Sequence, residues 1–170
     1  MECPRRTLLA MILTAFVAGG VGAQATDTTG VRMAGLTWFL DSVLPKHRAN
    51  ITAVCVGFTD AAATGTRPVA SDAVDLNTAE LAALPKGSLP VHPGSACTVE
   101  QAAPKWTMVT ATGKRAVSVL VGPVRSLSAG QWSVGVQLRI NGRYGEGYLC
   151  EAVRAQNQWH ITGCRATWIS

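Results

Sequence analysis

The sequence predicts an α+β domain in which an N-terminal helix packs on a curved antiparallel β-meander of about four or five strands. Three observations predict it. An amphipathic segment lies near the start of the chain, β-rich segments separated by turn signals follow Lys105, and four cysteines lie downstream of an apolar leader. The helix therefore precedes the sheet, and the domain folds in an oxidising compartment.

The first 25 residues have the three parts of a secretory signal peptide. Two arginines precede an uncharged apolar run over residues 8–21, and small residues that fit a cleavage site follow it. A retained membrane anchor is the alternative, but the run is short for a bilayer span. We expect a signal peptide over residues 1–25, a single domain over residues 26–170, a periplasmic or secreted location, and no stable membrane span after cleavage.

Composition narrows the class of protein. About 145 residues remain after the leader, enough for one domain with a real core. The hydrophobic content of 48% and low charge favour an ordered globular chain. The net charge is +5, but the basic residues are scattered, with no run longer than Lys114-Arg115. Nucleic-acid binding favours clustered charge, so we exclude nucleic acid as a partner.

Residues 31–44 carry apolar residues at helical spacing, and Pro45 marks the end of this first helix. The β-rich segment Asn50–Phe58 predicts a strand that holds Cys55.

A second helix is predicted over Leu76–Leu84. Asn77 is a good N-cap, Glu80 stands three residues later to complete a capping box, and Pro85 stops the helix. Residues 86–96 read as a loop that delivers Cys97.

The rest of the chain predicts the meander. Strands are expected over Trp106–Ala111, Ala116–Val124, Trp132–Ile140, Arg143–Ala155 and Trp159–Ile169. Asn141-Gly142 is a strong hairpin signal, and a two-residue turn there pairs Val134 with Leu149. That register places Gly145 and Gly147 on the core face.

Four cysteines and no metal-type spacing predict two disulfides and no metal site. A three-residue turn over residues 156–158 sets Cys150 directly opposite Cys164, close enough for a bridge. We therefore prefer the pair Cys150–Cys164, which leaves Cys55 with Cys97.

Glycine within a strand indicates a close approach. We expect the N-terminal helix to cross the sheet at Gly145 and Gly147, or a bulge to bend it there. The opposite face is polar and aromatic, which suits a binding surface, unless the Cys97 loop or the second helix covers it. Gln137 and Arg154 share that face with six candidate binding residues: Arg139, Tyr144, Glu146, Tyr148, His160 and Trp168.

No catalytic set is assembled in the sequence. There is no nucleophile elbow, phosphate loop or dinucleotide fingerprint, and paired cysteines leave no free thiol. His160 with Glu146 offers acid–base groups on one face, but they do not make a demonstrated dyad. We expect no catalytic residues and no cofactor.

The C-terminal part also resembles a known type of domain. A Gly-x-Gly-Tyr strand and a closing Trp-Ile-Ser resemble small exported bacterial domains of the cystatin-like or NTF2-like α+β type. The residues that carry the resemblance are Gly145, Gly147, Tyr148, Trp159, Trp168, Ile169 and Ser170. The resemblance implies a helix on a curved meander, in a group that includes enzymes, ligand carriers and protease inhibitors. The chain lacks the Gln-Val-x-Gly loop of inhibitory cystatins.

These observations favour an exported, non-enzymatic binding protein of unknown ligand, with an envelope protein or a small ligand as its partner. One alternative is an inhibitor or immunity protein against an envelope-targeting enzyme. A second alternative is a small NTF2-like hydrolase or isomerase that uses His160 in a cavity.

Overall fold

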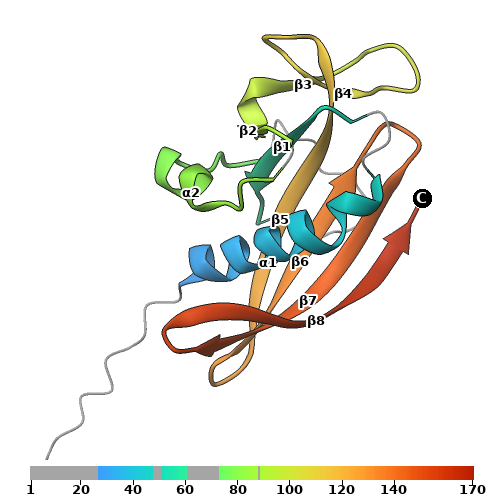
Figure 1. Cartoon of the computed structure of the whole chain (residues 1–170). Helices are drawn as coiled ribbons and strands as arrows, with labels where there is room; N and C mark the ends of the chain where they lie inside the picture. Colours follow the sequence, from blue (N-terminus) through green and yellow to red (C-terminus); the bar gives the residue numbers. More distant parts are fainter. Residues whose placement is uncertain (1–26, 48–50, 61–72, 88) are drawn as a thin grey trace, which may run out of the picture.

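The computed structural model describes residues 27–47, 51–60, 73–87 and 89–170 (Figure 1). The predicted signal peptide lies outside these residues. Within them, no helix is both long and apolar enough to cross a membrane.

The fold is built on one mixed sheet of eight strands. Six strands form its main path in the order β2-β1-β5-β6-β7-β8, and β3 and β4 extend it beside β5. β1 runs parallel to both of its neighbours, whereas the other pairs are antiparallel. The strands are β1 Ala53–Phe58, β2 Val91–Pro93, β3 Cys97–Val99, β4 Thr107–Val109, β5 Lys114–Ser128, β6 Gln131–Arg139, β7 Gly145–Ala155 and β8 Gln158–Ile169.

The predicted fold class is wrong in its architecture. The protein is a large mixed sheet with one helix and a second short one, not a helix packed on a four- or five-stranded meander. The two strands that were not predicted, β2 and β3, have three residues each, too few for a periodic pattern. β4 lies within the predicted strand Trp106–Ala111 and pairs with both β3 and β5. β1 reaches its parallel partner β5 through a long connection rather than a hairpin, so no single turn signal predicts that the two strands pair. The cystatin-like and NTF2-like expectation falls with the meander.

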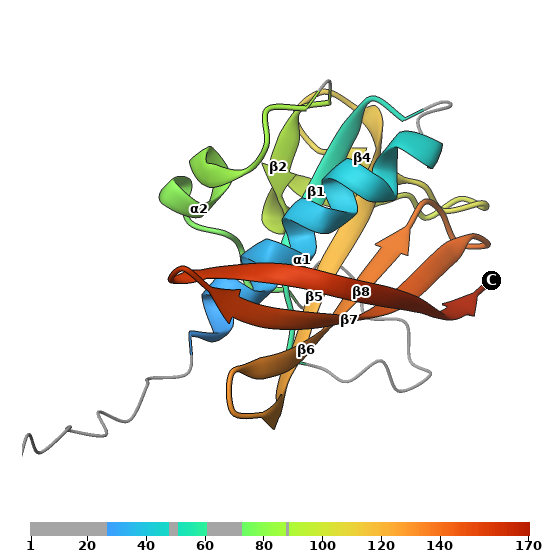
Figure 2. The ribbon, with the colours of Figure 1, turned by 60° about the horizontal axis from the view of Figure 1, so that its bottom comes forward.

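The long helix α1 (Thr28–Ser42) lies across one face of β5 to β8 (Figure 2). Asp27 caps it by accepting a hydrogen bond from the amide of Gly30 at 2.8 Å. Leu36 and Phe39 are fully buried in the core between helix and sheet. Gly35 lets the helix backbone approach the sheet, because a Cβ there would lie 3.1 Å from the side chain of Val134.

Two short helical segments complete the fold. The 3-10 helix η1 (Leu44–His47) follows α1 directly. α2 (Thr78–Ala83) has the predicted capping box, in which the amide of Glu80 donates to Asn77 at 2.9 Å and the amide of Asn77 donates to Glu80 at 2.7 Å.

The β6–β7 hairpin has a different register from the predicted one. Asn141 accepts hydrogen bonds through its side chain from the amides of Arg143 (2.8 Å) and Tyr144 (2.9 Å), which makes the turn one residue longer. Val134 therefore pairs with Cys150 rather than with Leu149. Since side chains alternate along a strand, this single step exchanges the two faces of β7.

Both predicted disulfides are present. Cys150 and Cys164 are directly opposed across β7 and β8, and Cys55 is joined to Cys97. The route to the first pair differs from the prediction, because a two-residue turn at Gln156-Asn157 is followed by a bulge that restores the register. The face of β7 that carries Cys150 packs in the core beneath α1, whereas the prediction placed Cys150 on the outer face of the sheet.

We predict that the two disulfides differ in their contribution to stability according to the loop that each closes. The sequence separations are 14 residues for Cys150–Cys164 and 42 for Cys55–Cys97. Replacing each pair by alanine should lower the free energy of unfolding by about 3 and about 4 kcal/mol respectively in the chain-entropy model. Urea unfolding of the two double variants measures this order, and the reverse order would show that burial of Cys150 outweighs loop length.

Candidate functional site

The structure separates the six predicted binding residues. Tyr144, Glu146 and Tyr148 are brought together on the helix side of the sheet. Arg139 and Trp168 line a pocket on the outer side. His160 lies apart from both groups, so the single face predicted for all six does not exist.

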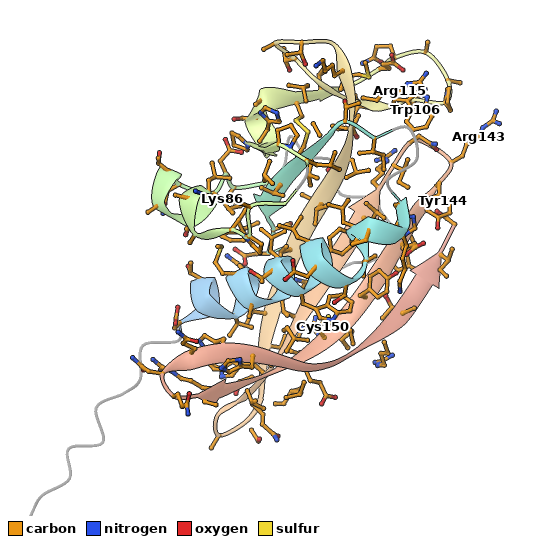
Figure 3. All side chains as sticks on the ribbon, viewed as in Figure 1. Lys86, Trp106, Arg115, Arg143, Tyr144 and Cys150 are labelled. Carbon is orange, nitrogen blue, oxygen red and sulfur yellow. A yellow bond between two sulfur atoms is a disulfide. The ribbon has the colours of Figure 1, made fainter. Side chains whose placement is uncertain are left out.

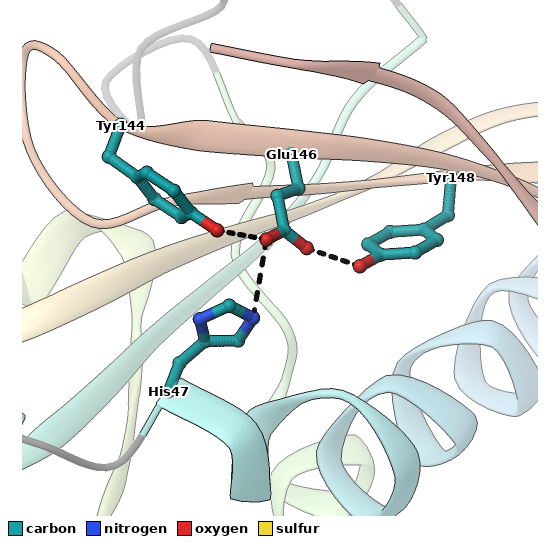
Figure 4. A network of polar contacts seen from close by, with 4 residues as sticks. All are labelled: His47, Tyr144, Glu146 and Tyr148. Atoms are coloured by element: carbon teal, nitrogen blue, oxygen red, sulfur yellow. Dashed lines mark hydrogen bonds and ion pairs between the residues drawn. The ribbon is translucent and has the colours of Figure 1, made fainter.

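The first group is a buried cluster centred on the carboxylate of Glu146, which is only 6% exposed (Figure 4). The hydroxyl of Tyr144 donates to one carboxylate oxygen and that of Tyr148 to the other. Nε2 of His47 lies 3.4 Å from Oε1 of Glu146. Trp38 packs edge-on against Tyr148, with ring centroids 5.6 Å apart.

The cluster shifts the pKa values of its members in opposite directions. Burial alone would raise the pKa of Glu146, but hydrogen bonds from the two tyrosines and the nearby His47 outweigh it and lower that pKa. The hydrogen bond to Glu146 is the main cause that raises the pKa of Tyr144, followed by burial. Burial is the main cause for Tyr148, followed by the hydrogen bond to Glu146.

These shifts point to a structural clamp. Raised pKa values keep the Tyr144 and Tyr148 phenols protonated, so neither is activated as a nucleophile. The Glu146 carboxylate has a partner on each oxygen and is closed off from a substrate. The cluster ties η1, through His47, to β7, and so fixes the end of the helical segment on the sheet.

The second group forms a pocket on the outer face. Trp168 lies across Gly145 and Gly147, since a Cβ on Gly147 would meet Nε1 of the indole at 2.0 Å. A close approach to these glycines is present, as predicted, but the approaching group is the indole of Trp168 on the neighbouring strand β8 rather than the N-terminal helix. The pocket is lined by Ser118, Leu120, Gln137, Leu138, Arg139, Asn141, Tyr144, Gly145, Trp168 and Ser170.

Gln137 is the unusual residue of this pocket. Its side chain is 7% exposed, and its Nε2 is buried without a hydrogen-bond partner among the residues that the structure describes. Buried amide donors almost always have a partner in native proteins, so an unpaired one in a pocket wall indicates a place for a ligand acceptor.

The predicted cover of the outer face is only partial. Cys97 packs with Cys55, Val109 and Ala116 in a small second core over β1, β4 and β5. The pocket beside Trp168 is left accessible by the part of the chain that the structure describes.

His160 is exposed and lines an open groove between α1, α2 and the β7–β8 hairpin. It pairs with Val153, whereas Glu146 pairs with Ile169 near the other end of the same two strands. The structure therefore does not bring His160 and Glu146 together as acid–base partners.

Two residues of these sites are not singled out by sequence reasoning. His47 belongs to a separate basic segment, and no sequence pattern links it to β7. The alternation of β6 does predict Gln137 on the outer face, but it cannot show that the amide lacks a partner. Among the described residues, no group of three or more His, Cys, Asp and Glu side chains could hold a metal ion.

No family model, no curated protein and no solved structure matches this chain.

We predict that Glu146 makes stability depend on pH in the acidic range. Its pKa is lowered in the fold, so its contribution is complete above the unfolded value of about 4.3 and is lost as pH falls through the lower folded pKa. Urea unfolding between neutral and acidic pH should show a smaller loss for Glu146→Gln than for the native protein. Glu151→Gln, on an exposed residue of the same strand, is the control and should keep the native pH profile.

A second prediction uses the fact that Tyr144 and Tyr148 are the only tyrosines of the chain. Both should ionise above the ordinary pKa of 10.0 in an ultraviolet titration of the folded protein. In Glu146→Gln, the pKa of Tyr144 should shift toward 10.0 because its hydrogen-bond acceptor loses its negative charge, whereas the pKa of Tyr148 should stay raised by burial. Ionisation of both tyrosines at their ordinary pKa in the native protein would contradict the cluster.

Proposed function

We propose that the protein is an exported, non-enzymatic binding protein that holds a small ligand in the outer-face pocket. The single observation that carries the proposal is the buried amide nitrogen of Gln137, a pocket-lining residue, which has no hydrogen-bond partner among the described residues. A ligand oxygen placed there would satisfy a donor that otherwise costs about 1–3 kcal/mol of stability.

The other pocket walls suit the same role. Trp168 offers an apolar ring held by its two glycines, and Leu120 adds apolar surface. A few polar groups among apolar walls are typical of small-molecule sites. The expected ligand therefore combines a hydrogen-bond acceptor with a flat apolar part.

The lining also supports binding rather than catalysis. Arg139 is the only residue with a charged side chain among the described residues that line the pocket. An arginine does not exchange its proton near neutral pH, so it is a recognition group rather than a general acid or base. The buried Glu146 cluster and the disulfide between Cys150 and Cys164 support the sheet from its other side.

We predict that Gln137→Leu separates stability from binding. Leucine has a similar volume and removes a buried amide nitrogen that has no partner among the described residues, so the free energy of unfolding should be unchanged or higher by about 1 kcal/mol. A structural role for Gln137 would instead make the variant less stable. Gln131→Leu, on an exposed residue of the same strand, is the control, and urea unfolding is the measurement.

Binding itself can be followed by NMR. The chain has five tryptophans, so Trp168→Phe identifies one of five indole N–H signals. In a screen of small aromatic acids, amides and alcohols, a ligand should shift the Trp168 indole and the Gln137 side-chain amide together and saturably. Gln137→Leu should lose that response while Gln131→Leu keeps it. Compounds that shift only groove residues such as Trp38 would place the site elsewhere.

A further inference from the structure

We infer that the ligand of the outer-face pocket is an organic anion whose charged group faces a basic rim made by Lys105 and Arg143. The inference rests on the proposed binding function and adds the chemical class of the ligand.

The rim begins where two loops touch. The amide of Gly142 donates a hydrogen bond to the carbonyl of Pro104 at 2.6 Å. Lys105 follows Pro104, and its Cβ would lie 3.2 Å from a Cβ on Gly142. This contact places Lys105 beside the turn that carries Arg143.

Arg115 lies near the same end of the sheet but on its helix side, because Val117 and Val119 of the core share its face of β5. Its guanidinium lies over the ring of Trp106, 4.5 Å from the ring centroid. Because Trp106 adjoins Lys105, Arg115 adds positive charge at this end of the sheet without being part of the rim. Figure 3 shows Arg115, Trp106, Arg143 and Tyr144 along the same side of the molecule.

The rim and the pocket share one loop. Asn141 and Tyr144 line the pocket and enclose the turn that holds Arg143. Arg139, at the end of β6, lies in the pocket itself. A ligand seated against Trp168 and Gln137 therefore has positive charge at the loop end of its site.

The rim is a positive surface. Lys105 and Arg143 are exposed, and the ion pairs found among the described residues join other groups, Arg32–Asp60 and His47–Glu146. Glu100 is the acidic residue of the adjoining loop, and its backbone amide donates a hydrogen bond to the carbonyl of Trp106. Among the described residues, two exposed cations beside the one half-buried carboxylate of Glu100 favour an anion over a neutral or cationic ligand.

The test compares matched acids and amides. Phenylacetate and phenylacetamide, and hexanoate and hexanamide, are titrated into the protein while the Trp168 indole and Gln137 amide signals are followed by NMR. At low salt each acid should bind about tenfold more tightly than its amide, and high salt should remove the difference.

Charge variants locate the effect. Lys105→Gln with Arg143→Gln should weaken the acids about tenfold and leave the amides unchanged. The control, Lys86→Gln with Arg125→Gln, removes the same charge from exposed residues outside the rim and should leave all four affinities unchanged.

Three results would overturn the inference. If acid and amide bind equally, the ligand class is wrong although the pocket stands. If the control pair weakens the acids as much as the rim pair, net charge rather than the rim is responsible. If the acids shift rim signals but neither Trp168 nor Gln137, the anion does not bind in the pocket. The NMR screen of small aromatic acids, amides and alcohols described above tests the pocket itself, independently of the charge of the ligand.

Discussion

The side-chain hydrogen bonds of Asn141 decide which face of β7 meets the core. By accepting from the amides of Arg143 and Tyr144, Asn141 makes the turn one residue longer than the Asn-Gly signal suggests. Cys150 then pairs with Val134, and the residues that share its face turn toward α1. The buried cluster, the buried disulfide and the outward glycines all depend on this one turn.

Two further features lock that register. The disulfide joins Cys150 to Cys164 from the core side, so β8 cannot slip relative to β7 without breaking it. Bulges at Thr162 and Thr167 adjust the pairing on both sides of the bridge, and the second brings Trp168 opposite Gly147. They also interrupt the outer edge of β8, which discourages pairing with another strand. The same adjustment thus serves the core, the pocket and the solvent edge.

Features with local causes could be predicted from the sequence. The capping box of Asn77 and Glu80 and the long strands β5 to β8 have sequence signals within a few residues. Both disulfides could be predicted because four cysteines allow few pairings. The register of β7 could not be predicted, because the side chain of Asn141 competes with a two-residue turn and the outcome depends on neighbouring loops such as Pro104. The contact of His47 with Glu146 could not be predicted either, because the two residues are far apart in the sequence and meet only when η1 packs against the assembled sheet.

The two candidate sites differ in how completely their polar groups are satisfied. In the cluster, each oxygen of Glu146 has a hydrogen-bonded tyrosine, and the arrangement stabilises the fold without need of a ligand. In the pocket, glycines at 145 and 147 weaken a strand, and Gln137 buries a donor without a partner among the described residues. Departures from local stability tend to mark functional positions in natural proteins. The outer-face pocket, where these departures coincide, is therefore the better candidate for function, and the cluster beneath it holds the sheet that presents it.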